Sequence, residues 1–155
     1  MNFPKKLLLV CSVSTARSKM AEGFFRDFFI RNEMDVSVSS GGIASNARDG
    51  MLISLDAKLV MKEIGIILSD NAVSIDLKKR PELIKQADLI LTLTEKHKKE
   101  VLKYNNSSEN KVQTLREFAG ESGDIEDPSM KGVEGFRKSR DEINRCIFKG
   151  LKRLE

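Results

Sequence analysis

Residues 7–22, LLLVCSVSTARSKMAE, decide how the rest of the chain is interpreted. The apolar run from Leu7 to Val10 predicts a buried strand that ends at Cys11, and a short segment of small residues follows it. A strongly helical pattern then begins at Arg17. We therefore expect a strand, a tight loop and a helix, with a cysteine at the carboxyl end of the strand.

The loop between this strand and helix has the features of an anion-binding site. The N-terminus of a helix offers unpaired backbone N–H groups and the positive end of the helix dipole. A cysteine thiolate in the same place is stabilised and becomes a nucleophile near neutral pH. The planar guanidinium of Arg17 can bind two oxygens of a phosphoryl group at once. Together these groups indicate phosphoryl transfer to Cys11.

The simpler interpretation is that Cys11 is a small core residue, because a cysteine at the end of a buried strand usually is. A Cys-x5-Arg spacing also arises by chance. Two further features favour the functional interpretation. The loop lies between a strand and a helix, where an anion cradle is expected. Residues 124–128, DIEDP, also place carboxylates in a polar, glycine-containing loop far downstream.

Residues 11–22, CSVSTARSKMAE, and residues 117–128, EFAGESGDIEDP, together resemble the low-molecular-weight protein tyrosine phosphatases. The likeness extends over essentially the whole chain, including the spacing between the two motifs. It implies one phosphatase-like domain over residues 1–155. It also implies a three-layer, Rossmann-like α/β fold, in which helices flank a four-stranded parallel sheet.

The resemblance also assigns roles to individual residues. Cys11 corresponds to the nucleophile that forms a cysteinyl-phosphate, and Arg17 to the cation that binds the equatorial oxygens. Ser18 corresponds to the hydroxyl that supports the thiolate. Asp127 corresponds to the acid that protonates the leaving group and later deprotonates the hydrolytic water. The phosphate-binding loop would comprise Ser12, Val13, Ser14, Thr15, Ala16 and Ser18.

Asp124 and Glu126 compete with Asp127 for the role of acid. Only Asp127 stands before a proline, as the acid of the family does. Pro128 restricts Asp127 to an extended conformation and would hold it at the edge of the loop. We therefore expect Asp127 to be the acid.

The loop departs from the family pattern Cys-x-Gly-Asn-x-Cys-Arg-Ser at three positions. Val13 replaces the glycine, Ser14 the asparagine and Ala16 the second cysteine. Valine tolerates a positive φ poorly, so the loop would be strained if Val13 needed one. Ser14 can make fewer hydrogen bonds than an asparagine amide. Lys19 also replaces the usual proline.

Thr15 bears on the choice of substrate. In the family an aliphatic residue at this position accompanies phosphotyrosine enzymes, whereas a threonine marks the bacterial branch that resembles protein arginine phosphatases. The aromatic residues that often follow the Asp-Pro pair are also absent, since Ser129 and Met130 stand there. The alternative is that Thr15 only caps the loop and that the pocket is permissive.

Three classes of function stay open from the sequence. The first is a cysteine-dependent phosphatase acting on phosphotyrosine or phosphoarginine. The second is a non-catalytic oxyanion-binding relative, which the replacements Val13 and Ser14 would favour. The third is a thiol-dependent arsenate reductase, which needs further cysteines near the site. Cys146, on the expected last helix, is a poor candidate and is interpreted as structural.

Composition sets limits on partners and cofactors. The net charge of +4 comes without a basic block interleaved with aromatic residues, so no nucleic-acid partner is expected. No apolar run approaches the roughly 20 residues of a membrane span. The two distant cysteines predict a reduced, cytoplasmic protein. We expect a monomer that acts on phosphorylated protein or small phosphate esters. We expect no cofactor and, because His97 is the only histidine, no metal.

The rest of the chain alternates strands and helices, which predicts a parallel sheet with its site beyond the carboxyl ends of the strands. The expected strands are 36–40, 89–93 and 112–115, with a turn at Gly41-Gly42 after the first. The expected helices are 54–64, with Ile64 on its core face, 81–86, 95–104 and a last one bearing the stripe Phe136, Ile143, Ile147, Leu151 and Leu154. Polar segments are expected at 105–110 and 116–131. His97 is interpreted as part of a solvated helix face.

Overall fold

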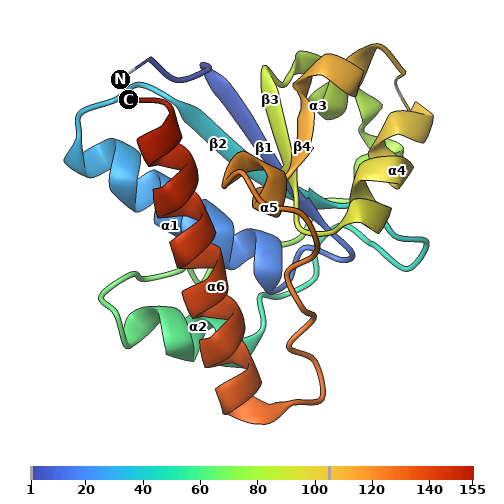
Figure 1. Cartoon of the computed structure of the whole chain (residues 1–155). Helices are drawn as coiled ribbons and strands as arrows, with labels where there is room; N and C mark the ends of the chain where they lie inside the picture. Colours follow the sequence, from blue (N-terminus) through green and yellow to red (C-terminus); the bar gives the residue numbers. More distant parts are fainter. Residues whose placement is uncertain (1, 105) are drawn as a thin grey trace.

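Strand β1 (Lys6–Cys11) lies inside a sheet of four parallel strands, in a computed structural model that describes residues 2–104 and 106–155. The other strands are β2 (Ser37–Gly42), β3 (Leu89–Thr92) and β4 (Val112–Thr114), and the order across the sheet is β2-β1-β3-β4 (Figure 1). The predicted four-stranded parallel sheet is confirmed.

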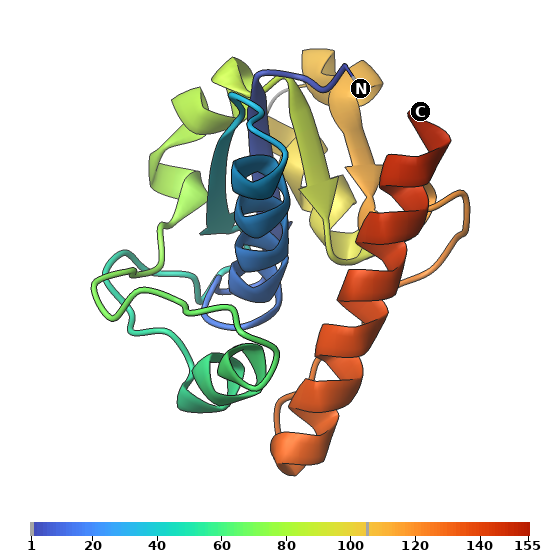
Figure 2. The same ribbon diagram turned by 90° about the vertical axis from the view of Figure 1, so that its left-hand side faces the viewer.

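Helices cover both faces of the sheet, which makes the three layers expected for this fold. Figures 1 and 2 show α1, α2 and α6 on one side and α3 and α4 on the other. Alternate residues of β1 serve the two cores, because successive side chains of a strand point to opposite faces. Leu7 and Leu9 pack with α1 and α6, and Leu8 and Val10 pack with α3 and α4. The helices are α1 (Arg17–Arg31), α2 (Leu55–Lys62), α3 (Pro81–Gln86), α4 (Glu95–Tyr104), α5 (Leu115–Phe118) and α6 (Gly132–Arg153), with 3₁₀ turns η1 (Leu77–Lys79) and η2 (Asn106–Lys111).

Two predicted boundaries near the site were wrong. Gly41-Gly42 does not form a turn, because β2 continues alongside β1 until Gly42 lies opposite Cys11. The helix expected over 54–64 is the shorter α2, whose cap Ser54 accepts a hydrogen bond from the N–H of Ala57. Ile64 lies beyond α2 and is 44% exposed, so it does not belong to the core face.

The second half of the chain follows the prediction more closely. The helices expected over 81–86 and 95–104 are confirmed. Leu115 begins α5 instead of ending β4, because Thr114 and Glu117 form a reciprocal capping box. Of the expected polar turn, residue 105 lies outside the described residues and the rest belongs to η2. Leu154 follows α6 and is exposed.

The carboxyl ends of the four strands meet at one edge of the sheet, since all pairings are parallel. That edge carries Cys11, Gly42 and the residues that follow β3. The loop 121–128 reaches the same edge, because the N–H of Ile125 donates to the carbonyl of Leu93 over 2.9 Å. Within the described residues no helix is long and apolar enough to cross a membrane.

Candidate active site

The main chain of the loop after β1 is held from outside by its carbonyl groups. The carbonyl of Cys11 accepts from the N–H of Ile43 (3.1 Å), that of Ser12 from Ala44 (3.0 Å), and that of Thr15 from Ser54 (2.9 Å). No hydrogen bond among the described residues uses an N–H group of residues 12–16 as donor. The loop therefore keeps these N–H groups for an anion, as a phosphate cradle requires.

A glycine on β2 lets the loop lie close to the sheet. A Cβ atom at Gly42 would stand 2.7 Å from the carbonyl oxygen of Ser12 and 2.8 Å from main-chain atoms of Val13. Such contacts are too short for any side chain. A glycine is thus required at position 42 because the main chain of the loop lies so close to it. Its neighbour Gly41 faces the side chain of Leu77, in the core on the other side of the sheet.

The hydroxyls of Ser14 and Ser18 form a buried chain that ends at Cys11, the predicted nucleophile. Ser14 Oγ lies 2.9 Å from Ser18 Oγ, and the thiol of Cys11 donates to Ser18 Oγ over 3.1 Å. Once Cys11 is a thiolate, the Ser18 hydroxyl can turn and donate to the sulfur while it accepts from Ser14. Ser14 thus keeps a buried hydrogen bond to Ser18 at the position where the family pattern has an asparagine.

The concern about Val13 was misplaced, because the strained position is the next residue. Ser14 has a φ of 62°, in the left-handed region, and Val13 is not among the non-glycine residues with positive φ. Serine tolerates this region better than a β-branched residue does. The loop therefore accommodates valine without the strain that its sequence suggests.

Arg17 joins the loop to the segment that carries the candidate acid. It is the first residue of α1 and is only 6% exposed. Its Nη1 donates to the carbonyl of Ile125 over 2.8 Å. Ile125 stands two positions before Asp127. Arg17 therefore contacts residues 121–128 directly, and this segment, which carries the candidate acid, is called the acid loop below.

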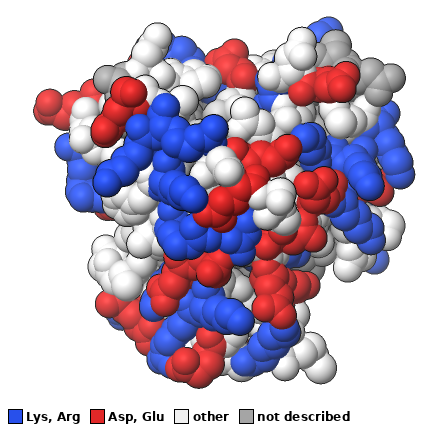
Figure 3. Space-filling model, viewed as in Figure 1, with Lys and Arg blue, Asp and Glu red and all other residues white. Residues whose placement is uncertain are grey.

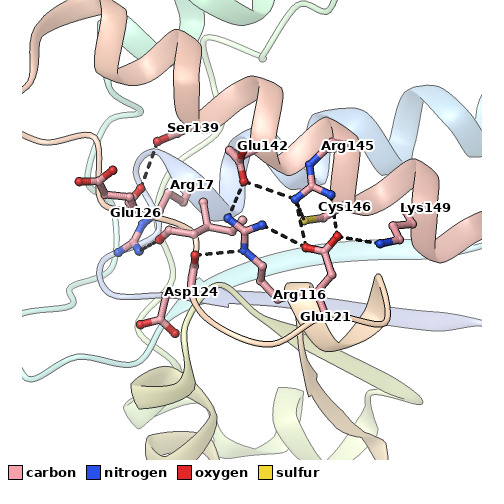
Figure 4. A network of polar contacts seen from close by, with 11 residues as sticks. Arg17, Arg116, Glu121, Asp124, Glu126, Ser139, Glu142, Arg145, Cys146 and Lys149 are labelled. Atoms are coloured by element: carbon pink, nitrogen blue, oxygen red, sulfur yellow. Dashed lines mark hydrogen bonds and ion pairs between the residues drawn. The ribbon is translucent and has the colours of Figure 1, made fainter.

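The acid loop is also fastened to α6 through Arg116 (Figure 4). The Nε of Arg116 donates to the carbonyl of Asp124 (3.2 Å), and its Nη atoms bind the carboxylates of Glu121 (3.2 Å) and Glu142 (2.5 Å). Ser139 on α6 donates from its hydroxyl to the carbonyl of Glu126 over 3.1 Å. The sequence analysis did not identify Arg116 as part of this assembly.

The three acidic residues of the loop have different surroundings. Asp124 accepts from the N–H of Glu95 over 2.8 Å, at the start of α4, and Glu126 pairs with Lys131. Asp127 is exposed, and its Oδ1 accepts only the N–H of Ser129 (2.9 Å) among the described residues.

The pKa of Asp127 lies below its ordinary value. Desolvation opposes this shift, but the hydrogen bonds from Ser129 and the positive charge of Arg17 outweigh it. Asp127 is thus a carboxylate at neutral pH. It must gain a proton before it can act as an acid, and a bound phosphoryl dianion favours that protonation.

Comparison with known proteins identifies the family. The sequence model of the low molecular weight phosphotyrosine protein phosphatases matches residues 6–155. The chain belongs to this family. It is therefore a cysteine-dependent phosphatase, and the predicted family, fold class and type of enzyme are confirmed.

Three similar proteins illustrate the relationship. The protein-arginine-phosphatase of Geobacillus stearothermophilus is 33% identical over 98% of this chain and 97% of its own. A low molecular weight protein tyrosine phosphatase from T. tengcongensis has a TM-score of 0.87 and 32% identity, over 96% of this chain and 99% of its own. The third is a structure of the YwlE arginine phosphatase, a cysteine-to-serine mutant with a phosphorylated active-site serine. It has a TM-score of 0.84 and 32% identity, over 97% of this chain and 99% of its own.

One residue of this phosphatase lies elsewhere than predicted, and a second is buried despite its charge. His97 does not face solvent: it is 4% exposed, and its Nε2 lies 2.8 Å from the hydroxyl of Ser12. One sequence signal for its burial was available: His97 follows the helix cap Thr94 closely, at the end of the sheet where the predicted site lies. Lys19 is also buried, and its Nζ donates to the carbonyl of Val73 over 3.1 Å. Burial lowers the pKa of Lys19, although the nearby Glu22 carboxylate opposes this shift.

Cys146 is a core residue on α6, consistent with the structural role predicted for it. It is fully buried, is not part of a disulfide, and its pKa is raised by burial. The described residues of the phosphatase contain no cluster of three or more His, Cys, Asp or Glu side chains that could hold a metal ion.

Proposed function

We propose that this phosphatase hydrolyses phosphoarginine in proteins, with phosphotyrosine as a second substrate. One observation carries the preference. Thr15 lies half-buried in the loop, its carbonyl is fixed by Ser54, and no hydrogen bond among the described residues uses its hydroxyl. That hydroxyl can therefore accept an N–H of a guanidinium, which an aromatic phosphate ester lacks. The arginine phosphatases among the similar proteins support the same choice.

The proposed reaction passes through a covalent intermediate. The Cys11 thiolate attacks phosphorus, so that an S–P bond forms while the P–N bond of phosphoarginine (or the P–O bond of phosphotyrosine) breaks. Asp127 donates its proton to the leaving nitrogen or oxygen. Water then attacks the cysteinyl-phosphate, Asp127 takes a proton from it, and inorganic phosphate leaves as the thiolate returns. The phosphorylated serine mutant of YwlE supports this intermediate.

The loop stabilises charge at each stage of the proposed reaction. Arg17 and the N–H groups of Ser12, Val13, Ser14, Thr15 and Ala16 would bind the equatorial oxygens. Losing one such preorganised donor costs roughly 10²–10³ in rate. Ser18, supported by Ser14, would hold the sulfur as a thiolate before attack and after hydrolysis.

The two alternative functions have less support. A non-catalytic role would follow from a damaged loop, but Ser14 occupies the strained position and keeps its hydrogen bond to Ser18. An arsenate reductase would need a second reactive thiol. Cys146 lies on α6 and is fully buried in the hydrophobic core. We therefore favour the phosphatase over both.

We further propose that residues 1–155 act as one domain, as a monomer in the cytoplasm, where a reducing environment keeps Cys11 as a thiol. Acidic and basic side chains alternate over the face that carries α6 (Figure 3). Such a surface favours neither nucleic acid nor an anionic membrane.

The first experiment compares release of phosphate from phosphoarginine and phosphotyrosine peptides by the wild type and by Cys11→Ser. Wild type should act on both, with the larger kcat/KM for phosphoarginine. Cys11→Ser should fold, bind vanadate and lose nearly all turnover, because a serine hydroxyl is not ionised there. Substantial turnover by the serine variant would show that the reaction does not depend on the Cys11 thiolate.

A second experiment isolates the substrate preference. Thr15→Ile keeps a β-branched side chain and removes the hydroxyl, so the ratio of kcat/KM should shift towards the phosphotyrosine peptide. Thr15→Ser, which keeps the hydroxyl, is the matched control and should retain the original preference. An unchanged ratio in Thr15→Ile would identify an ordinary tyrosine phosphatase.

A further inference from the structure

His97 lies outside the predicted loop and contacts it through the hydroxyl of Ser12. It lies on the first turns of α4, in the otherwise charged sequence EKHKK, yet is 4% exposed. Its Nε2 stands 2.8 Å from the hydroxyl of Ser12, the residue after the nucleophile. The other ring nitrogen, Nδ1, is buried without a hydrogen-bond partner among the described residues.

The surroundings of the ring keep it neutral. The charged groups that act on it are Arg17 at the start of α1, Lys96 on α4 itself, and Asp124 and Asp127 on the acid loop. Burial is the largest influence and Arg17 the next, and together they lower the pKa of His97 to about 4. A neutral imidazole has one donor and one acceptor nitrogen, so it can bond Ser12 without adding a second cation beside Arg17.

Ser12 is thereby held from two sides. Its carbonyl accepts from the N–H of Ala44, and a Cβ atom at Gly42 would stand 2.7 Å from that carbonyl oxygen. Its hydroxyl is held on the side of α4 by His97. The main chain between these two anchors supplies N–H groups to the anion cradle, so their direction depends on both.

We propose that His97 is a positioning residue of the phosphatase: its neutral ring fixes the Ser12 hydroxyl and so orients the first N–H groups of the phosphate-binding loop. This inference rests on the proposed function, because it concerns the same loop. His97 acts through Ser12 and need not touch the substrate.

Two amide substitutions separate this role from simple filling of space. In His97→Gln the amide reaches about as far as Nε2 and can still bond Ser12. In His97→Asn the amide ends near the place of Nδ1 and cannot. The measured quantities are the inhibition constant of inorganic vanadate and kcat/KM for an activated aryl phosphate. We expect His97→Asn to weaken vanadate binding and to lower kcat/KM about tenfold, the usual effect of one lost hydrogen bond. His97→Gln should recover most of both.

Ser12→Ala in each background tests whether the effect passes through Ser12. Ser12→Ala should lower kcat/KM about tenfold in the wild type and in His97→Gln. It should have no further effect on kcat/KM in His97→Asn, because the effects of coupled residues are not additive. Thr94→Ala is the control for damage to α4. Thr94 accepts the N–H of His97 as helix cap (3.1 Å), so its loss should lower Tm and leave vanadate binding unchanged.

Additive effects of Ser12→Ala and His97→Asn would overturn the proposal, and so would wild-type vanadate binding in His97→Asn. If His97→Asn does not fold, the cycle with His97→Gln decides: a Ser12→Ala effect that vanishes there contradicts the proposal. A wild type that binds vanadate but cleaves neither phosphopeptide would refute the proposed substrates while leaving this test intact.

Discussion

The hydroxyl of Ser14 lies 2.9 Å from the hydroxyl of Ser18, in a part of the loop that is fully buried. Ser14 meets two demands at once: it takes a positive φ of 62° and it supports the hydroxyl next to the Cys11 sulfur. These two demands can be tested separately, because different substitutions satisfy one, both or neither.

Three substitutions of Ser14 should therefore rank differently in stability and in rate. Ser14→Asn keeps a polar group and tolerates the left-handed region, so we expect near wild-type Tm and kcat. Ser14→Gly relieves the strain but loses the hydroxyl, whereas Ser14→Ala loses the hydroxyl and keeps the strain. The free energy of unfolding of Ser14→Gly should exceed that of Ser14→Ala by about 1 kcal/mol. Both variants should show a similarly reduced kcat, because both lack the hydroxyl. Thermal unfolding and steady-state kinetics check the two orders, and equal kcat in Ala and wild type would contradict the role of the hydroxyl.

Gly42→Ala should damage the site more than the fold. Its Cβ would meet the main chain of the loop at 2.7–2.8 Å, so the loop must move, and misplacement on this scale costs roughly 100-fold in kcat/KM. Gly41→Ala is the matched control, because its Cβ meets the side chain of Leu77 at 2.5 Å on the other core. We expect it to lower Tm more than activity. The reverse pattern in the two variants would mean that Gly42 does not shape the loop.

Arg116→Gln should reproduce part of the kinetic effect of removing Asp127, the proposed acid. Without Arg116 the carbonyl of Asp124 loses its anchor, so Asp127 is held less well. As in Asp127→Asn, kcat should fall mostly for substrates with poor leaving groups, while vanadate binding stays unchanged. Arg145→Gln is the control, because Arg145 binds the same Glu121 (2.7 Å) but no carbonyl of the acid loop in the described structure. Equal losses for an activated aryl phosphate and for a phosphopeptide would show that the loop does not deliver the acid through Arg116.

The stability of the protein should depend on His97 between about pH 4 and 6.5. The folded pKa of His97 is lowered to about 4 from 6.5, so in this range the unfolded chain binds a proton that the folded chain does not. Stability is therefore unaffected above pH 6.5 and declines as the pH falls, by about 3 kcal/mol at pH 4. His97→Gln removes this titration. Urea unfolding at pH 7 and at pH 4.5 should show a smaller decline for His97→Gln, and an identical decline would mean that the folded ring protonates normally.

Much of the candidate site could be predicted because its residues are adjacent in sequence. Cys11, Arg17 and Ser18 lie on one strand–loop–helix unit, and a local motif is enough to place them. The four-stranded sheet follows from the alternation of strands and helices together with the family resemblance. Asp127 also has a local signal, the proline that follows it.

What the sequence did not reveal depends on contacts between distant segments. His97 has charged neighbours on both sides, and only the packing of α4 against the loop buries it. Arg116 meets Glu142 across 26 positions of sequence, without a motif that marks the pair. The strain expected at Val13 was displaced by one residue, because the position with positive φ depends on how the whole loop turns.

The contact between Arg17 and Ile125 spans 108 positions of the chain. During synthesis, the cysteine and its loop therefore leave the ribosome long before Asp127, the proposed acid. The acid loop is in turn bonded to α6, which follows it in the chain. A growing chain can present the phosphate-binding loop, but it cannot hold the acid loop in place until α6 has also been made and folded.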